Sequence, residues 1–168
     1  MTSTAPVLLE PWTDADLGLE RLFNTPEMTA HNGGPRPDEE IVARHHRYLA
    51  LPADGEGQIF RVHLPGEPEP VGSIGYWTKE WRGEPVYEMG WMVLPGHQGR
   101  GIATAATVAA AEHARVAGKH RSAHAFPPVA NTASNAICRK AGFKLVEECE
   151  FEYPKGNFLR CNDWRLFL

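Results

Sequence analysis

Two glycines stand between an apolar, strand-like run and an alanine-rich segment that contains no proline. Gly99 and Gly101 let the backbone approach a ligand with no side chain in the way. If a helix begins at Ile102, the N–H groups of its first turn lack partners within the helix, and the helix dipole favours an anion there. Residues 93–104 are therefore typical of a phosphate- or pyrophosphate-binding turn, although a plain strand-to-helix turn has a similar pattern.

Two common kinds of phosphate site do not fit this turn. No Gly-Lys-Ser/Thr follows it, as a P-loop requires. Reading Gly-x-Gly from Gly99 puts Thr104 where the dinucleotide-binding fingerprint has its third glycine. The pattern that remains is Gln98-x-x-Gly101-x-Ala103.

A second segment, residues 131–143, has the pattern of a short amphipathic helix. Its apolar residues fall at helical spacing, and Gly142 suits the position just after a helix end. An ordinary helix with a glycine stop explains Gly142 and Phe143. It does not require the particular combination Asn131-x-x-Ser134 that precedes them.

Together the two segments resemble the GNAT N-acetyltransferases. The first resembles the acyl-CoA pyrophosphate loop, written Gln/Arg-x-x-Gly-x-Gly/Ala, and the second the later motif Asn-x-x-Ser with Gly-Phe at its end. The branch most similar is the one that acetylates protein N-terminal amines and small amines. The resemblance implies acetyl-CoA as co-substrate and no metal. It implies pyrophosphate contacts, largely through backbone N–H groups, from Gln98, Gly99, Arg100, Gly101, Ala103 and Thr104, and pantetheine contacts from Asn131 and the backbone near Met92 and Val93.

Glu88 is the candidate base, because an ammonium has no lone pair and must lose a proton before it can attack. The run Tyr87–Trp91 resembles the Glu-(apolar)-Gly-Tyr/Trp run of that branch, and a carboxylate among Tyr, Met and Trp would be partly desolvated, which raises its pKa. A solvent-facing glutamate on a half-buried strand is the alternative. Glu80 and Glu84 lie in sequence that is typical of a turn, and are weaker candidates.

The resemblance points to Ser134 as the acid that protonates the departing thiolate. Helix capping or a hydrogen bond to CoA is an equal alternative for Ser134, and Asn131 has the residue type of an N-cap. Tyr87 and Tyr153 are reserve candidates for the acid. If His124 faces the cleft it could be a second base or an acceptor contact; the alternative is a histidine whose hydrogen bonds are made within the sheet. Trp77 and Trp91 are expected to be core residues, and Trp81, in a polar turn, is the aromatic most suited to contact a ligand.

Composition fits one soluble domain spanning residues 1–168. The hydrophobic fraction is 42%, the charged fraction 23% and the net charge -4, so no nucleic-acid footprint is visible. No run approaches the roughly 20 apolar residues of a membrane span, and the first six residues do not resemble a signal peptide. Three scattered cysteines without a Cys-x-x-Cys pair favour reduced thiols and a cytoplasmic location.

The order of expected elements is also that of the GNAT family. Strands are expected over residues 7–12, 58–64, 71–77, 85–94, 121–126, 144–153 and 158–168, with a polar turn over 79–85. Helices are expected to about residue 23 and over 37–51, 102–117 and 131–141. The prediction is an α/β fold: a mixed, mostly antiparallel sheet of about six to seven strands flanked by about four helices. The first two helices would form the acceptor-binding part.

The sequence thus predicts an acyl-CoA-dependent N-acyltransferase. It would transfer acetyl from acetyl-CoA to a primary amine by direct attack in a ternary complex. A small-molecule amine and a protein N-terminal amine fit equally as acceptors. The alternatives are a catalytically idle acyl-CoA-binding regulator and an O-acyltransferase on the same fold. No membrane partner is expected, and exposed strands of the C-terminal hairpin make a homodimer possible.

Overall fold

The structure, a computed structural model, describes residues 5–168. Its strands are β1 Leu8–Pro11, β2 Gly57–His63, β3 Gly72–Trp81, β4 Glu84–Val93, β5 Ser122–Ala125, β6 Lys144–Glu152 and β7 Phe158–Phe167. Its α-helices are α1 Leu17–Phe23, α2 Asp38–Ala50, α3 Ile102–Ala117 and α4 Thr132–Lys140, and two short 3-10 helices, η1 Asp14–Asp16 and η2 Pro95–His97, precede α1 and α3.

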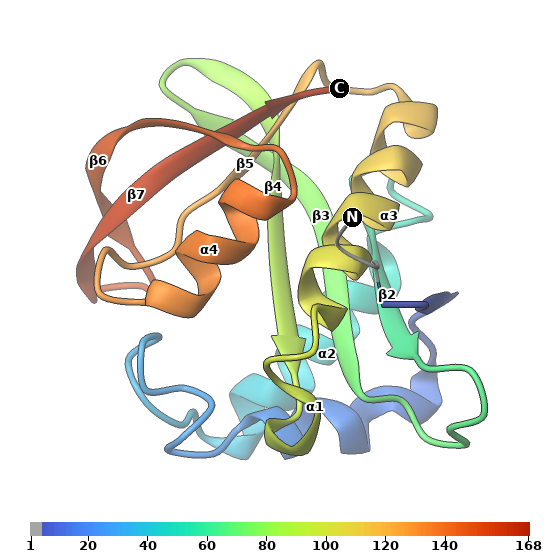
Figure 1. Ribbon diagram of the computed structural model, residues 1–168. Helices are drawn as coiled ribbons and strands as arrows, with labels where there is room; N and C mark the ends of the chain where they lie inside the picture. Colours follow the sequence, from blue (N-terminus) through green and yellow to red (C-terminus); the bar gives the residue numbers. More distant parts are fainter. Residues whose placement is uncertain (1–4) are drawn as a thin grey trace.

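The seven strands form one sheet in the order β1-β2-β3-β4-β5-β7-β6 (Figure 1). Every neighbouring pair is antiparallel except β4 and β5. Helices α3 and α4 contribute to the main hydrophobic core on one face, whereas α1 and α2 pack with a smaller apolar cluster on the other. This architecture confirms the predicted fold class.

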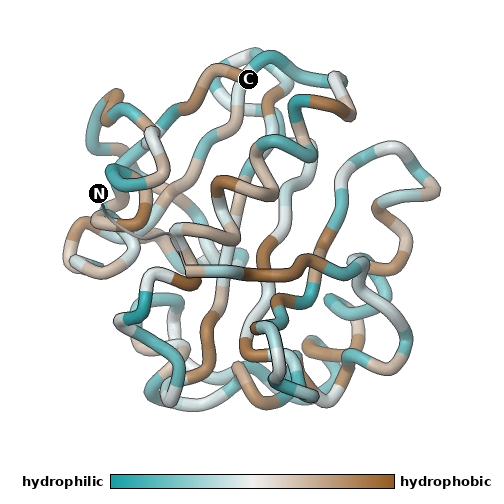
Figure 2. Tube along the Cα trace, turned by 45° about the vertical axis from the view of Figure 1, so that its right-hand side comes forward, coloured by the Kyte–Doolittle hydropathy of each residue, from teal (hydrophilic) through white to brown (hydrophobic). Residues whose placement is uncertain are grey.

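The alanine-rich sequence of α3 explains how closely this helix lies on the sheet. Ala106, Ala110 and Ala114 recur at helical spacing and are essentially inaccessible to solvent. Their small side chains bring the helix axis near β3 and β4, which places the helix start beside the end of β4. Figure 2 shows hydrophobic stretches running through the middle of the molecule and hydrophilic ones through the outer loops. Within residues 5–168 no helix combines the length and the apolar character needed to cross a bilayer.

The parallel strands β4 and β5 stay together over a very short distance. Their register contains two pairs, Tyr87 with Ala123 and Glu88 with His124. Beyond Glu88, β4 continues to Val93, whereas the chain after β5 turns away and Pro128 forms a bridge to Cys161 of β7. The two strands therefore part beyond Glu88, and Figure 1 shows the chain after β5 diverging from β4.

The expected polar turn over residues 79–85 is wrong. Strand β3 runs to Trp81 and β4 starts at Glu84, so the turn consists of Arg82 and Gly83. Both have positive φ, 50° and 81°, as a two-residue hairpin turn of the primed type requires. An arginine at the first of these positions gives little sequence indication of such a turn, because positive φ normally favours Gly, Asn or Asp. Trp81 consequently lies on a strand and not in a loop.

Candidate active site

The start of α3 presents a row of unpaired backbone donors. The N–H groups of His97 and Gln98 bond back into η2, and that of Ala105 bonds to the Gly101 carbonyl at 3.0 Å. Between them, none of the N–H groups of residues 99–104 has an acceptor within the described part of the chain. Consecutive free donors at a helix N-terminus make a binding site for an anion.

The two glycines produce this geometry. Gly99 and Gly101 have φ of 73° and 77°, in the left-handed region, and open space surrounds the position of a Cβ at either residue. Arg100 between them is exposed and pairs with no carboxylate of residues 5–168. It lines a hollow of about 230 Å³ together with Ile102 and the segment Leu64–Pro65. Arg100 therefore brings positive charge beside the free N–H groups, although Glu67 also lines the hollow.

The backbone of β4 offers bonding groups where β5 has turned away. The N–H of Leu94 bonds to the carbonyl of Val71 at 2.9 Å, which fixes the alternation of the strand. By that alternation the backbone groups of Met92 are directed at β3, whereas those of Val93 are directed into the gap. The Val93 carbonyl accepts from Gln98 Nε2 at 2.9 Å. The Gln98 side chain thus ties the glycine turn to the end of β4, and the Val93 N–H faces the gap.

Glu88 lies at the point where the strands part, on the face of the sheet that α1 and α2 cover. Its side chain is 18% exposed. Trp77, its register partner on β3, donates from Nε1 to Glu88 Oε2 at 3.2 Å, and Lys79 Nζ is 3.9 Å from the same oxygen. Burial raises the pKa of Glu88, and Lys79 and the Trp77 hydrogen bond counter part of that rise.

The direction of this pKa agrees with the sequence-based expectation, but the desolvating neighbours differ. Tyr87, Met89 and Trp91 project to the opposite face, as alternation along a strand requires. The indole that contacts Glu88 comes instead from the neighbouring strand. Trp77 was expected to be a core residue only, and the register of β3 against β4 could not be obtained from the sequence.

Ser134 lies on the other face, in the first turn of α4. Its backbone N–H bonds to Asn131 Oδ1 at 3.1 Å, so Asn131 is the N-cap of the helix. Its hydroxyl oxygen accepts from Trp91 Nε1 at 3.3 Å. That bond joins β4 to α4 and leaves the Ser134 hydrogen available for donation. Asn131 uses its oxygen in the cap, and its Nδ2 group has no partner within residues 5–168.

Trp91 is therefore a site residue that sequence reasoning missed. It was expected to be part of the core, and it does pack against the main core cluster. The indole N–H, however, donates to the hydroxyl of Ser134, the serine of the family motif. A tryptophan three residues after Glu88 falls on the opposite face of the strand, so one short segment supplies groups to both sides of the gap.

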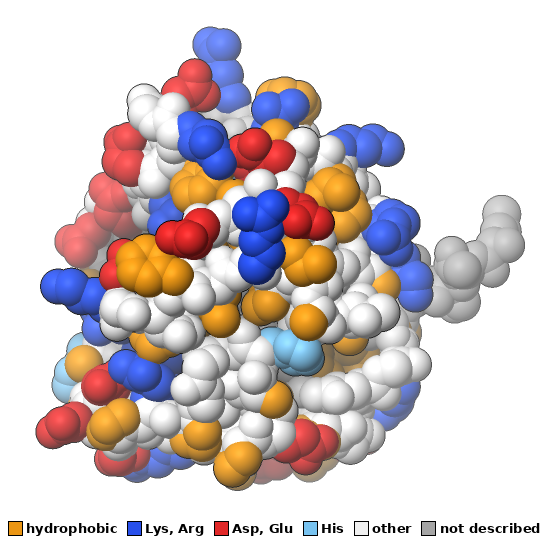
Figure 3. Space-filling view, turned by 90° about the vertical axis from the view of Figure 1, so that its left-hand side faces the viewer, with side chains coloured by type: hydrophobic (Ala, Val, Ile, Leu, Met, Phe, Trp, Pro, Cys, Tyr) orange, Lys and Arg blue, Asp and Glu red, His pale blue; other side chains and the backbone are white. Residues whose placement is uncertain are grey.

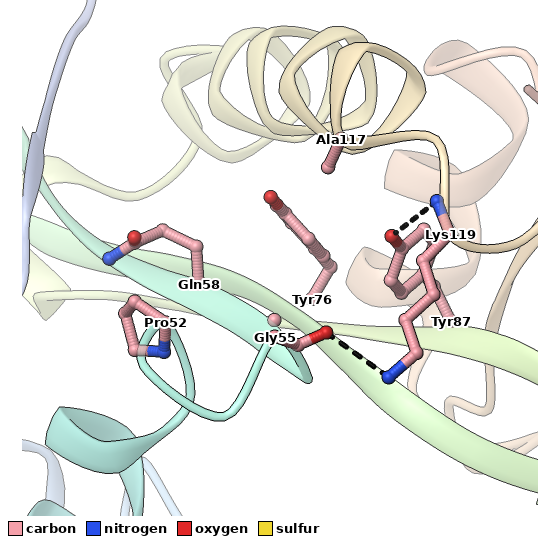
Figure 4. A pocket seen from close by; sticks show the side chains of 8 residues that line it. Pro52, Gly55, Gln58, Tyr76, Tyr87, Ala117 and Lys119 are labelled. Carbon is pink, nitrogen blue, oxygen red and sulfur yellow. Dashed lines mark hydrogen bonds between the residues drawn. The ribbon is translucent and has the colours of Figure 1, made fainter.

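Tyr87 and Tyr153, the other two candidates for the acid, lie in different parts of the structure. Tyr87 lines a hollow of about 260 Å³ between the α2–β2 connection and the end of α3, and Figure 4 shows the side chains around it. The Tyr87 hydroxyl accepts from the backbone N–H of Lys119 at 3.3 Å, just beyond the end of α3 (Figure 4). Tyr153 is 40% exposed, and its hydroxyl accepts from Arg44 at 3.1 Å.

A bridge crosses the Glu88 face of the sheet from α2 to the β6–β7 hairpin. Arg44 on α2 pairs with the buried Glu20 of α1 and donates to Tyr153 at the hairpin tip. The turn of the hairpin also lies against Gly33 in the α1–α2 connection. Figure 3 views this side of the molecule, where the surface is hollowed near its middle and hydrophobic side chains show beside charged ones.

The remaining candidates, His124 and Trp81, both bond to Asp163 of β7. His124 Nδ1 is 2.6 Å from Asp163 Oδ1, and Trp81 Nε1 donates to Asp163 Oδ2 at 3.0 Å. Both residues bond to the same carboxylate, which is 2% exposed. The Trp81 indole N–H is therefore already hydrogen-bonded within the protein. The edge of its ring still packs against Phe126 and Phe151 on the Glu88 face.

Comparison with known proteins identifies the family. Residues 7–144 match the profile of the acetyltransferase (GNAT) domain, and the chain belongs to that family. No curated protein matches the chain significantly.

Solved structures share the whole fold. RimL, described as ribosomal L7/L12 alpha-N-protein acetyltransferase in complex with coenzyme A, has a TM-score of 0.78 at 19% identity, covering 100% of this chain and 97% of RimL. Mycobacterium smegmatis RimJ in complex with CoA-disulfide has a TM-score of 0.76 at 18% identity, covering 97% and 82%. The acetyltransferase AAC(6')-Ib, in complex with acetyl-CoA, has a TM-score of 0.77 at 20% identity, covering 96% and 93%. At these identities the likeness establishes the fold.

Proposed function

We propose that this protein transfers an acetyl group from acetyl-CoA to a primary amine. The observation that carries the proposal is the placement of two groups on opposite faces of β4, where it parts from β5. Glu88, on one face, is suited to remove a proton from an amine. Ser134, on the other face, is suited to donate one to a thiolate.

The donor is expected to lie along the gap between β4 and β5. Its pyrophosphate would accept from the N–H groups of residues 99–104, with Arg100 adding a charged contact. Its pantetheine arm would bond to the Val93 N–H and to Asn131 Nδ2. By strand alternation Met92 would contribute only its side chain. This arrangement brings the thioester to the level of Glu88 and Ser134.

The acceptor would approach from the face that carries α1, α2 and the β6–β7 hairpin. Its lone pair, freed by Glu88, would attack the thioester carbonyl, and a backbone N–H of β4 that faces the gap near Glu88 would stabilise the oxyanion. Collapse of the intermediate expels the thiolate toward Ser134. A small amine and a protein N-terminal amine both meet these requirements, because the chemistry concerns the amino group alone. A homodimer through the exposed β6 edge is compatible with this scheme.

The test is release of free CoA from acetyl-CoA in the presence of a panel of amines. The panel includes short peptides with free N-termini, polyamines and aminoglycosides. Glu88→Gln is expected to lower kcat/KM about 10²–10⁴-fold at neutral pH while the Kd for acetyl-CoA stays within about twofold. The matched control is Glu80→Gln, which removes the same charge from an exposed position on the neighbouring strand.

The outcomes separate three accounts. Transfer that depends on Glu88 supports the N-acetyltransferase. Binding of acetyl-CoA without transfer to any amine, in both wild type and Glu88→Gln, supports an idle acyl-CoA-binding module. Transfer to hydroxyl acceptors but not to amines supports the O-acyltransferase.

A further inference from the structure

The proposed transfer requires two proton acceptors, and Glu88 is only one of them. An alkylammonium loses a first proton to become a nucleophile. The nitrogen loses a second proton after attack, because the tetrahedral intermediate carries a positive charge on nitrogen. Ser134 returns one proton to sulfur. The overall reaction, RNH₃⁺ + acetyl-SCoA → acetyl-NHR + CoASH + H⁺, therefore releases one proton after two have been removed.

His124 occupies the position next to Glu88 in the sheet. The two residues are register partners across the short parallel pairing of β4 and β5, so their side chains project to the same face. The Nδ1 atom of His124 is 2.6 Å from Asp163 Oδ1 on β7, on the side of β5 away from Glu88. Because the two ring nitrogens point in divergent directions, Nε2 is directed away from Asp163.

The ring is held in one orientation. Asp163 is a carboxylate and can only accept, so the hydrogen of this bond lies on His124 Nδ1 and Nε2 carries the lone pair of the neutral ring. Phe126 stacks on the imidazole with an interplanar angle of 14° and a centroid distance of 5.9 Å. Within residues 5–168, Nε2 of His124 has no hydrogen-bond partner. It is also not one of the fully buried side-chain atoms that lack a partner, so some of its surface is accessible.

We propose that His124, oriented by Asp163, is the second catalytic base of the transfer. This rests on the proposed function. The arrangement is that of an Asp–His pair whose second nitrogen has no protein partner, on the residue that pairs with Glu88 where the strands part. Asp163 contacts the ring, and the ionisable register neighbours of His124 are Glu88 on β4 and Arg165 on β7. Lys79 on β3 lies beside Glu88, and Cys149 and Cys161 cluster with Phe126, which stacks on the ring.

The proton steps then balance. Glu88 takes the first proton from the ammonium, and the freed lone pair forms the C–N bond while the carbonyl π pair moves to oxygen. Nε2 of His124 takes the second proton from the positively charged nitrogen. The oxygen pair re-forms the carbonyl, the C–S bond breaks, and the thiolate receives the Ser134 proton, which solvent replaces. His124 and Glu88 return two protons to solvent, one of which offsets the proton regained by Ser134.

The experiment is the pH dependence of kcat/KM for wild type and for His124→Asn. Asparagine can place its Nδ2 group near the Nδ1 position, keep the bond to Asp163 and remove only Nε2. Two bases that must both be deprotonated give wild type a slope of about two in log kcat/KM on the acid side. In His124→Asn we expect a slope of about one, kcat about 10²-fold lower and an unchanged Kd for acetyl-CoA.

Asp163→Asn is the second variant, in case the first does not fold. Its amide would face Nδ1 with an N–H, place the ring hydrogen on Nε2 and remove the lone pair from the site while the histidine remains. The same fall in the slope of log kcat/KM is expected.

Replacing a purely structural histidine would lower the melting temperature and leave the slope at two. A slope of two in either folded variant, or activity within twofold of wild type, would overturn the proposal. Wild type that acetylates no amine overturns the proposed function and this proposal together, whereas transfer with an unchanged slope overturns this proposal alone.

Discussion

Lys79 is the cation beside Glu88 that favours its ionised form, and replacing it by Met tests the electrostatics of the proposed base. Methionine has nearly the length of the lysine stem and no charge. In the wild type the ammonium is 3.9 Å from Glu88 Oε2 and favours the ionised carboxylate. Its removal leaves burial opposed only by the Trp77 hydrogen bond, so the pKa of Glu88 rises further.

The size of the effect follows from the distance. Two unit charges 3.9 Å apart interact by roughly 1 kcal/mol in water and roughly 4 kcal/mol at an effective dielectric constant of 20. The side chains are 18% and 28% exposed, so solvent screens the pair and the lower end of this range applies. Since about 1.4 kcal/mol corresponds to a tenfold change in proton affinity, we expect the acid limb of kcat/KM to move up by about one pH unit.

The assay is the pH profile of CoA release at fixed ionic strength. Lys79→Met should reach the wild-type rate on the alkaline side and fall below it as pH decreases. Lys144→Met, which removes an equal charge from an exposed position at the start of β6, is the control and should leave the limb in place. A limb that stays in place in Lys79→Met, or moves to lower pH, would refute the assignment of Glu88 as the titrating base.

Three further predictions follow from other contacts. Trp91→Phe removes the donor to Ser134 and should lower kcat about 2- to 10-fold, with the Kd for acetyl-CoA within about twofold of wild type. Steady-state kinetics measure kcat, and calorimetry measures the Kd. An unchanged kcat would count against Ser134 as the acid. Arg44→Met leaves the buried carboxylate of Glu20 without its partner and should lower the free energy of unfolding in urea by about 3 kcal/mol. Tyr153→Phe, which removes an exposed hydroxyl, should lower it by less than about 1 kcal/mol. Equal losses in the two variants would contradict the proposed importance of the buried pair. Glu88→Gln should melt about 2–4 °C higher than wild type at pH 7, because a glutamate whose folded pKa is raised loses its stabilising contribution as pH rises. This difference in melting temperature should shrink toward pH 4. A difference that widened there would show that folding lowers the pKa of Glu88.

The sequence predicts most of the elements because their local patterns agree with the fold. The helix over residues 102–117 and the turn with Gly99 and Gly101 before it follow from local patterns, and the structure has both where expected. The turn at Arg82 and Gly83 was missed because its positive φ at arginine is imposed by the pairing of two long strands.

What surrounds each candidate site residue could not be predicted from the sequence. Trp77 reaches Glu88, and Asp163 reaches His124, only through the register of neighbouring strands. Trp91 reaches Ser134 across 43 residues of sequence, because α4 packs over the end of β4. Register and helix placement depend on long-range packing, so a single sequence can suggest the residue types of a site without giving the partners that hold them.

The most direct test of the proposed acetyl-CoA site is calorimetric titration of the wild type, Gly101→Glu and Gly83→Glu with acetyl-CoA. Both glycines have positive φ, 77° and 81°, with open space around the Cβ position, so both variants carry the same backbone strain and the same added charge. Only Gly101→Glu puts a carboxylate where the pyrophosphate would lie. We predict micromolar binding by wild type and Gly83→Glu, and binding at least about 10²-fold weaker by Gly101→Glu. Equal affinities in all three proteins, or no binding by the wild type, would contradict the assignment of this turn as the acetyl-CoA site.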